Sequence, residues 1–266
     1  MLATVDRKTI VNGIRRFFPK LWMERELRFR PNHFEREVWL VPFLCDKGKT
    51  ALDIGANMGI YSYLMRKSSR QVIAFEPNID LWSDLHRLLG RDFRIEGVAL
   101  SNRVGTSTMR IDNANTGVAT IEEKNDLCCV SDKSLVVEKV VEVRTLDSFA
   151  FSDIAMIKID VEGHEEAVVA GAVETIRRCR PSLLIESEER HNPGAPRRLA
   201  AFISHLDYVA LFLKGGKLLD FAELRDDDMD PNNFVRGDRE YINNFLFIPT
   251  DNSKKIEQMR DFLSQQ

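Results

Sequence analysis

Two short stretches combine glycines with acidic and amide side chains in a pattern that suits ligand binding. The stretch "ALDIGANMGIYS" at 51–62 ends an apolar run with an aspartate and continues into a glycine-rich turn, and "AFEPN" at 74–78 ends a second apolar run with a glutamate. A glycine-rich turn between a strand and a helix presents backbone N–H groups at the helix N-terminus, which attract an anion. We therefore expect 51–62 to bind a ligand that carries a negative group.

The spacing of the glycines indicates the kind of ligand. A dinucleotide-binding turn has the pattern G-x-G-x-x-G, in which the second glycine lets the backbone approach a pyrophosphate. Counted from Gly55, the second and third glycine positions hold Asn57 and Ile60, and the lysine of a P-loop is missing as well. A ligand without phosphates therefore fits this turn better than a dinucleotide.

Asp53 and Glu76 each end a predicted strand. They are therefore expected at the carboxyl edge of the sheet, where α/β proteins bind ligands and where an acid typically accepts hydrogen bonds from both ribose hydroxyls. A nucleoside with a carboxylate tail on the helix N-terminus, and with an amino or sulfonium charge near Asp53, satisfies these features. The sequence therefore predicts S-adenosyl-L-methionine as the cofactor.

A third stretch, "KIDVEGHEE" at 158–166, contains side chains that could act on a substrate. Side chains alternate along a strand, so Lys158 and Asp160 share one face, and Asp160 lies at the carboxyl edge, near the methyl group to be transferred. Methyl transfer to an oxygen needs that oxygen in line and its proton removed, by a base or by a metal that lowers its pKa. The candidate catalytic residues are Asp160, Glu162, His164 and His191.

Two other interpretations of these residues remain open. Glu162 and Glu165 suit a helix N-terminus through the helix dipole, and His164 is then an ordinary solvent-facing histidine. The carboxylates of Asp160 and of Glu186, on the next strand, are also of the type that Mg²⁺ and Mn²⁺ prefer. Asp160 and Glu186 are therefore the candidate metal ligands, although no spacing in the sequence demands a metal.

Strands and helices alternate from residue 50 onward, and they position these side chains. Asn57 is placed to cap the first helix. The β-α-β order predicts a parallel sheet with right-handed crossovers. Strands are expected at 50–55, 71–76, 93–100, 154–163, 182–188, 208–221 and 241–249, and helices at 58–67, 164–178 and 195–206.

Two segments depart from this alternation. Residues 1–45 form a basic extension with a predicted amphipathic helix, which either contacts a membrane surface through residues 7–22 or packs its apolar face on the domain that follows, 46–266. The first 30 residues contain eight basic and three acidic side chains. Within the domain, an insertion around 101–145 is either a lid or binding loop, or a solvated β-hairpin.

Several of these stretches together resemble the FkbM-type methyltransferase family. They occur in one order over residues 50–190: "LDIGANMGIYS", "AFEPN", "VALSNRVGT", "TLDSF", "IKIDVEGHEEAVVAGA" and "PSLLIE". The resemblance implies an α/β fold of the class I methyltransferase, or Rossmann-like, type. This fold is a three-layer sandwich around a seven-stranded, mostly parallel sheet whose last strand is antiparallel.

The resemblance also implies a reaction and a set of cofactor-binding residues. The reaction is O-methylation, often of a sugar hydroxyl in a glycoside, polysaccharide, glycolipid or natural product, so the partner is a small-molecule or glycan acceptor. By the family motif, the residues that hold the cofactor are Asp53, Gly55, Asn57, Gly59 and Glu76. The backbone near Val98 and Ala99 is expected to line the adenine pocket.

Composition limits the remaining possibilities. A net charge of −3 over 266 residues argues against a general nucleic-acid binder, and no apolar run approaches the roughly 18 residues that span a bilayer. The four cysteines lack zinc spacing and, with no signal peptide evident, fit a reducing cytoplasm. Two rival functions are considered: a nicotinamide-dependent oxidoreductase, which the missing glycines disfavour, and a non-catalytic binding module.

Overall fold

The computed structural model describes residues 18–30, 33–113, 118–125, 127, 130, 132–236 and 240–265, without the side chains of 234–236. The amphipathic helix predicted within the first 18 residues lies outside this part of the chain, apart from Phe18. Most of the segment predicted to contact a membrane, residues 7–22, lies outside it as well, and so do Cys128 and Cys129. Cys45 and Cys179 are free thiols.

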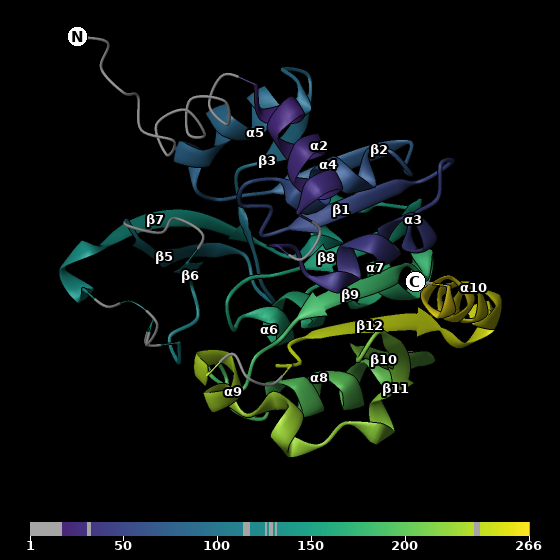
Figure 1. Ribbon diagram of the computed structural model, residues 1–266. Coiled ribbons are helices and arrows are strands. Elements are labelled where there is room, and N and C mark those ends of the chain that lie inside the picture. Colours follow the sequence, from purple (N-terminus) through teal and green to yellow (C-terminus); the bar gives the residue numbers. More distant parts are fainter. Residues whose placement is uncertain are drawn as a thin grey trace, which may run out of the picture.

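A large twisted sheet forms the centre of the protein (Figure 1). Five adjacent strands in the order β9-β8-β1-β2-β3 are parallel, and β12 pairs antiparallel with both β9 and β10. Within the described residues this sheet has eight strands: β11 (Lys217–Asp220), β10 (Tyr208–Lys214), β12 (Asn244–Pro249), β9 (Ser182–Glu186), β8 (Ile154–Ile159), β1 (Thr50–Ile54), β2 (Gln71–Phe75) and β3 (Arg94–Glu96).

The predicted α/β fold with a mostly parallel sheet is confirmed, but the sheet has eight strands in the described residues rather than seven. The last strand in the chain, β12, is antiparallel to both of its neighbours, as expected, and β11 is antiparallel to β10 as well. Every residue of β1, β8 and β12 is buried because helices cover both faces. The prediction of one strand over 208–221 was wrong. Gly215 and Gly216 both adopt positive φ angles, 55° and 75°, which turn the chain into the hairpin of β10 and β11.

Helices pack on both faces of the sheet. One apolar cluster joins the sheet to α6 (Glu165–Ala170), α7 (Val173–Cys179) and α8 (Ala195–Ser204), and a second joins the opposite face to α3 (Val41–Leu44), α4 (Ile60–Met65) and α10 (Ser253–Ser264). A third cluster joins α2 (Pro19–Phe29), α4 and α5 (Trp82–Leu89), and α9 spans Pro231–Arg236. None of the helices in the described residues combines the length and the apolar character that crossing a bilayer requires.

The segment predicted as an insertion folds as a second, smaller sheet that projects beside the large one (Figure 1). The long antiparallel pair of β5 (Gly105–Asp112) and β7 (Val136–Arg144) forms its body, flanked by β4 (Ala99–Leu100) and β6 (Ala119–Thr120). The strand expected at 93–100 is therefore divided between the two sheets. The division occurs at Gly97, where a Cβ atom would lie 2.6 Å from the Trp82 ring.

The helix predicted at 164–178 is also divided, at Gly171. This glycine packs against the chain that leads into β5, so that an added Cβ atom would lie 2.0 Å from the Ser101 carbonyl oxygen. Its φ angle is −83°, which any residue adopts, so the contact alone requires glycine here. The break between α6 and α7 therefore lies in close contact with the chain between β4 and β5.

We expect Gly171→Ala to destabilise the fold. A Cβ atom 2.0 Å from a backbone oxygen forces the chain apart, and overpacking of this kind costs about 1–3 kcal/mol. The free energy of unfolding, measured by urea denaturation, checks this. Gly48→Ala is the matched control, because its Cβ atom would meet only the flexible Asp46 side chain at 3.3 Å. Equal stability of the two variants would contradict the role assigned to Gly171.

Candidate active site

The turn after β1 brings its backbone very close to the end of β8. Gly55 has a φ angle of 79°, and an added Cβ atom would lie 1.8 Å from the Asp160 carbonyl oxygen. Gly59 has a φ angle of 80°, and its Cβ atom would lie 2.7 Å from a Leu85 methyl group. Both glycines are therefore required by close contacts as well as by their conformation.

Asn57 does not cap the following helix, contrary to the prediction. The helix begins at Ile60 with Gly59 as its N-cap and without a side-chain hydrogen bond. Asn57 itself has a φ angle of 47°, a left-handed conformation that asparagine tolerates better than most residues. Its Oδ1 atom is buried and has no hydrogen-bond partner among the described residues. Asn57 therefore provides a buried hydrogen-bond acceptor within the turn.

Glu76 connects this turn to the loop after β2. Its carboxylate accepts hydrogen bonds from the backbone N–H groups of Asn57 and Asn78, each at 2.8 Å. Burial raises the pKa of Glu76 to about 7, although these two hydrogen bonds act in the opposite direction. The carboxylate is thus fixed by the backbone on both sides, with its remaining lone pairs available to a ligand.

Two cavities lie beside this turn and have part of their lining in common. The first has a volume of about 160 Å³, and Glu76, Val98 and Ala99 line it together with Asp160, Glu162, His164 and Glu186. The second, of about 210 Å³, is lined by Asp53 and Lys158 among others, and Gly55, Asn57 and Asp160 line both. Six of the seven predicted cofactor residues therefore line these cavities. The seventh, Gly59, lies in the same turn and packs against Leu85.

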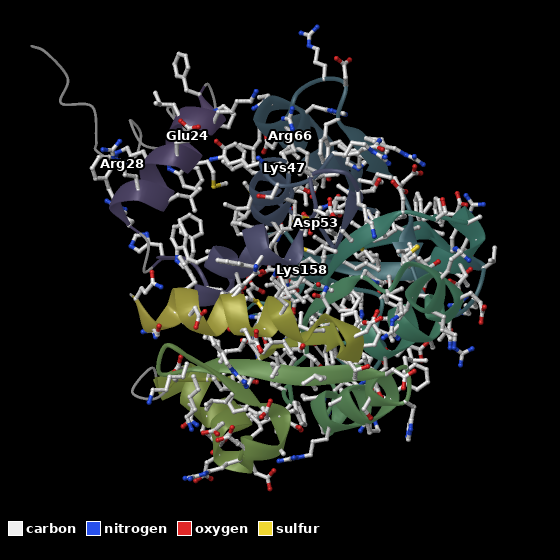
Figure 2. The ribbon with its side chains drawn as sticks, turned by 90° about the vertical axis from the view of Figure 1, so that its right-hand side faces the viewer. Glu24, Arg28, Lys47, Asp53, Arg66 and Lys158 are labelled. Atoms are coloured by element: carbon white, nitrogen blue, oxygen red, sulfur yellow. The ribbon has the colours of Figure 1, made fainter. Side chains whose placement is uncertain are left out.

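Asp53 lies at the base of the second cavity. It is buried and accepts a hydrogen bond from the Ser62 hydroxyl group at 2.6 Å. Burial raises its pKa to about 6, while the Ser62 hydrogen bond and the charge of Lys158 act in the opposite direction. Figure 2 shows Asp53 and Lys158 in the interior of the molecule. The second cavity therefore has a negative group and a positive group in its wall.

Lys158 is the central charged group of the site, and sequence reasoning gave it no role beyond a buried polar pair with Asp160. Its side chain is fully buried, with Nζ 3.6 Å from Asp160 Oδ2 and 4.0 Å from Glu186 Oε2. Nζ also lies 4.9 Å from the centre of the Tyr61 ring. Burial alone lowers the pKa of this lysine, but the two carboxylates outweigh it and hold the pKa above its usual value.

This arrangement corrects the prediction of a metal site. The ammonium group of Lys158 occupies the position between Asp160 and Glu186 in which the two carboxylates would share a cation. In the described part of the chain, no group of three or more acidic, histidine or cysteine side chains gathers with the geometry of a metal site. The pair that suggested Mg²⁺ or Mn²⁺ therefore has an amino group of the chain itself as its cationic partner.

Glu162 and His191 form a pair at the edge of the first cavity. Glu162 adopts a φ angle of 54°, a strained conformation for this residue, and its Oε2 atom lies 3.2 Å from His191 Nε2. Burial raises the pKa of Glu162 to about 8, with the charges of Asp160 and Glu188 adding to the effect, and burial lowers the pKa of His191. Both side chains are therefore neutral near pH 7, and only Glu162 lines the cavity.

His164 is held at both ring nitrogens rather than facing the solvent. Nε2 lies 2.9 Å from the Ser101 hydroxyl group, and Nδ1 lies 2.9 Å from Glu122 Oε2. Because both nitrogens are engaged, His164 would have to break one contact before it could accept a proton from a substrate. Sequence reasoning missed Ser101 and Glu122, since neither is close to His164 in the sequence.

The second sheet supports the turn that carries Glu162. Thr120 and Asn125 both donate a side-chain hydrogen bond to the Glu162 carbonyl oxygen, at 2.9 Å and 2.8 Å. Thr120 and Ile121 also line the first cavity opposite the large sheet. The insertion is therefore part of the site: it forms one wall of the cavity and fixes the backbone of the candidate catalytic turn.

Two polar side chains just before β12 form hydrogen bonds to glutamates at the end of β9 and directly after it. Asn243 donates a hydrogen bond to Glu186 at 2.8 Å, and Tyr241 donates one to Glu188 at 3.3 Å. Burial raises the pKa of Glu188, but the hydrogen bond from Arg190, the charges of His191 and Arg190 and the contact with Glu186 together outweigh it and hold the pKa below its usual value. The sequence signal for this group was the polar "YINN" at 241–244, directly before a buried strand.

Comparison with known proteins gives one family. The model of the FkbM methyltransferase domain matches residues 53–211, more than half of the chain, which includes the turn after β1 and the whole of β8. No curated protein sequence matches the chain.

Solved structures of methyltransferases resemble the fold of this chain at low sequence identity. Methyltransferase FkbM from Methylobacillus flagellatus KT is 15% identical, with a TM-score of 0.48; the match covers 92% of this chain and 63% of that one, so the chain spans less than two thirds of that protein. A putative methyltransferase from Streptococcus mutans in complex with SAH is 10% identical, with a TM-score of 0.44, and the match covers 80% of this chain and 98% of that one. An rRNA methylase from Streptococcus thermophilus is 12% identical, with a TM-score of 0.43, and the match covers 82% of this chain and 94% of that one.

We expect Glu162→Gln to flatten the pH dependence of stability. Because burial raises the folded-state pKa of Glu162 from 4.5 to about 8, the folded protein binds this proton more tightly than the unfolded chain does. The resulting stabilisation is complete below about pH 4.5 and falls as the pH rises through about 8. Between about pH 6 and about pH 9, the variant should lose less stability than the parent, by on the order of 1 kcal/mol.

Urea denaturation at a series of pH values measures this effect. Glu174→Gln, which removes an exposed carboxylate on α7, is the control and should follow the parent. If the Glu162→Gln protein loses as much stability as the parent over this range, the raised pKa is wrong.

Proposed function

The chain belongs to the FkbM methyltransferase family, and from this premise we propose that it transfers a methyl group from S-adenosylmethionine to a sugar hydroxyl. The observation that carries the proposal is the shared lining of the two cavities. The residues that fit the cofactor and the carboxylates that could receive a proton line two adjacent cavities, which have Gly55, Asn57 and Asp160 in common. Family membership also favours this function over the two rival hypotheses.

The residues around the turn fit S-adenosylmethionine. Glu76 has free lone pairs for the ribose hydroxyls, and the backbone at Val98 and Ala99 borders the same cavity where an adenine would lie. The unpartnered Asn57 Oδ1 atom can accept a hydrogen bond from the amino group of the cofactor. When bound, the cofactor supplies an electrophilic methyl group on a sulfonium centre.

The charge of the cavity walls supports a cationic cofactor over a dinucleotide. Six carboxyl groups, of Glu35, Asp53, Glu76, Asp160, Glu162 and Glu186, line the two cavities, together with the ammonium group of Lys158. Burial raises the pKa of Asp53, Glu76, Glu162 and Glu186, so a nearby cation favours the ionised form of each of them. A sulfonium is attracted to this site, whereas the pyrophosphate of a nicotinamide dinucleotide is repelled. The same repulsion disfavours an acceptor with a phosphate backbone.

Asp160 is the residue best placed to remove the proton of the acceptor. Its side chain is 32% exposed, it lines both cavities, and Lys158 holds it from the buried side. A hydroxyl group that donates its hydrogen bond to Asp160 would be held with its oxygen lone pairs free to attack. The carboxylate would take the proton when the oxygen gains the methyl group and the sulfur–carbon bond of the cofactor breaks to leave S-adenosylhomocysteine. Glu186 beside it can accept a hydrogen bond from a neighbouring hydroxyl, which suits a polyhydroxylated acceptor.

Glu76→Ala should weaken cofactor binding. Loss of the charge-assisted hydrogen bonds to the ribose should raise the dissociation constant for S-adenosylhomocysteine at least about tenfold. Isothermal titration calorimetry measures this, with NAD as a second ligand. Glu96→Ala is the control, because Glu96 ends the neighbouring strand β3 and does not line the first cavity. Preference for NAD, or equal affinity in the two variants, would contradict the proposed site.

Asp160→Asn should remove turnover and leave cofactor affinity within about threefold, because a general base typically contributes about 10²–10⁴-fold in rate. Methyl transfer from isotope-labelled S-adenosylmethionine to free sugars and glycan extracts provides the assay, and NMR of the product distinguishes an oxygen-bound from a nitrogen-bound methyl group. The control is Asp84→Asn, an exposed carboxylate on α5. Full activity of the Asp160→Asn protein would refute the assignment of the base, and a methyl group on nitrogen would refute O-methylation.

A further inference from the structure

Helix α2 buries only part of its surface. Met23 and Glu26 face inward, and Trp22 and Leu27 pack against the cluster that joins α2 to α5. The opposite side exposes three large apolar side chains at or beside the helix: Phe18 is 62% exposed, Leu21 62% and Phe29 69%. The packing of α2 on the domain therefore leaves a second, apolar face that the described residues do not cover.

Basic side chains share this exposed face. Positions 18, 21, 25, 28 and 29 follow the spacing of three and four residues that places side chains on one side of a helix. Phe18, Leu21 and Phe29 thus share this side of the helix with Arg25 and Arg28. Arg28 lies 5.6 Å from the centre of the Phe29 ring. Figure 2 shows Arg28 at the outer edge of the molecule.

The acidic residues of α2 offset only part of this positive charge. Glu26 is buried and pairs with Arg25 at 3.2 Å and with Arg30 at 3.7 Å, so one carboxylate stands against two guanidinium groups. Glu24 accepts a hydrogen bond from Tyr63 at 2.9 Å, and Lys67 lies 4.8 Å from the centre of that Tyr63 ring, which places a further cation next to α2. The face is therefore apolar and positively charged at the same time.

We propose that this face of α2, formed by Phe18, Leu21, Arg25, Arg28 and Phe29, docks on an anionic lipid bilayer. Apolar side chains enter the interface between headgroups and acyl chains, while arginines bind the lipid phosphates. The first 30 residues carry eight basic and three acidic side chains, and the remainder of the chain is net acidic. Of the eight basic residues, Lys20, Arg25, Arg28 and Arg30 lie in α2 or directly after it, where they are attracted to a negative surface.

The chemistry of the face favours a bilayer over other anionic partners. A nucleic acid would be bound by the arginines alone and would leave Phe18, Leu21 and Phe29 in water, whereas a bilayer removes them from water and also supplies the negative charge. A second copy of the chain would bring the same arginines face to face, and these like charges would repel.

Vesicle binding of the full-length chain tests the proposal. We expect cosedimentation with vesicles of phosphatidylcholine containing about 30% phosphatidylglycerol, little binding to phosphatidylcholine alone, and weaker binding as salt is added. Reversing the charges in Arg25→Glu/Arg28→Glu should lower the partition coefficient at least about tenfold. Leu21→Ser/Phe29→Ser should lower it as well, because less apolar area enters the interface.

Matched controls make the test specific to this face. Arg177→Glu reverses an exposed charge on α7, which packs on the opposite face of the large sheet, and Val140→Ser removes an exposed apolar side chain from β7. Both should bind like the parent, and circular dichroism should show that all variants are folded. The proposal is wrong if no binding to anionic vesicles occurs at low salt, or if the α2 variants bind like the controls. A concentration-dependent dimer in light scattering that the α2 variants abolish would also overturn it.

Discussion

The fully buried ammonium group of Lys158 is the interaction on which the rest of the site depends. Removing such a charge from water costs several kcal/mol, and the cost is offset only by close opposite charges and hydrogen bonds. Asp160 and Glu186 supply the charges, the Tyr61 ring faces the ammonium, and Asn244 Oδ1 lies 3.5 Å from it. Lys158 therefore contacts the carboxyl ends of β8 and β9, the start of β12 and, through Tyr61, the start of α4.

The same charge balance explains why the site favours a cation. One ammonium group cannot neutralise the carboxylates around the two cavities, and burial raises the pKa values of Asp53, Glu76 and Glu162 to about 6, 7 and 8. Each raised pKa means that ionisation is unfavourable until positive charge arrives. A bound sulfonium would provide it and would favour the ionised carboxylates, so cofactor binding would be accompanied by proton release.

Sequence reasoning predicted the parts of the structure that depend on local pattern. The parallel order of the sheet and the place of Asp53, Glu76 and Asp160 at its carboxyl edge follow from short apolar runs that end in acids, whereas the antiparallel last strand was expected from the resemblance to the family. What it missed depends on contacts between distant segments. Gly97 and Gly171 interrupt predicted elements because a ring or a carbonyl oxygen occupies the space of a Cβ atom, and no local pattern reveals that neighbour. The role of Lys158 was missed for the same reason, since Tyr61 and Asn244 lie far from it in sequence.

The insertion was the least predictable part, and its contacts give it a function in the site. Glu162 holds a strained left-handed conformation, which persists only where the surroundings impose it. Thr120 and Asn125 do so by hydrogen bonding to its carbonyl oxygen, while Glu122 and Ser101 fix His164. Asp53, Gly55, Asn57 and Glu76, by contrast, belong to β1, β2 and the turns of the large sheet, and of the predicted cofactor residues Ala99 alone lies in a strand of the second sheet, β4. Changes in β5 to β7 can therefore alter the wall formed by Thr120 and Ile121 and leave the turn after β1 in place.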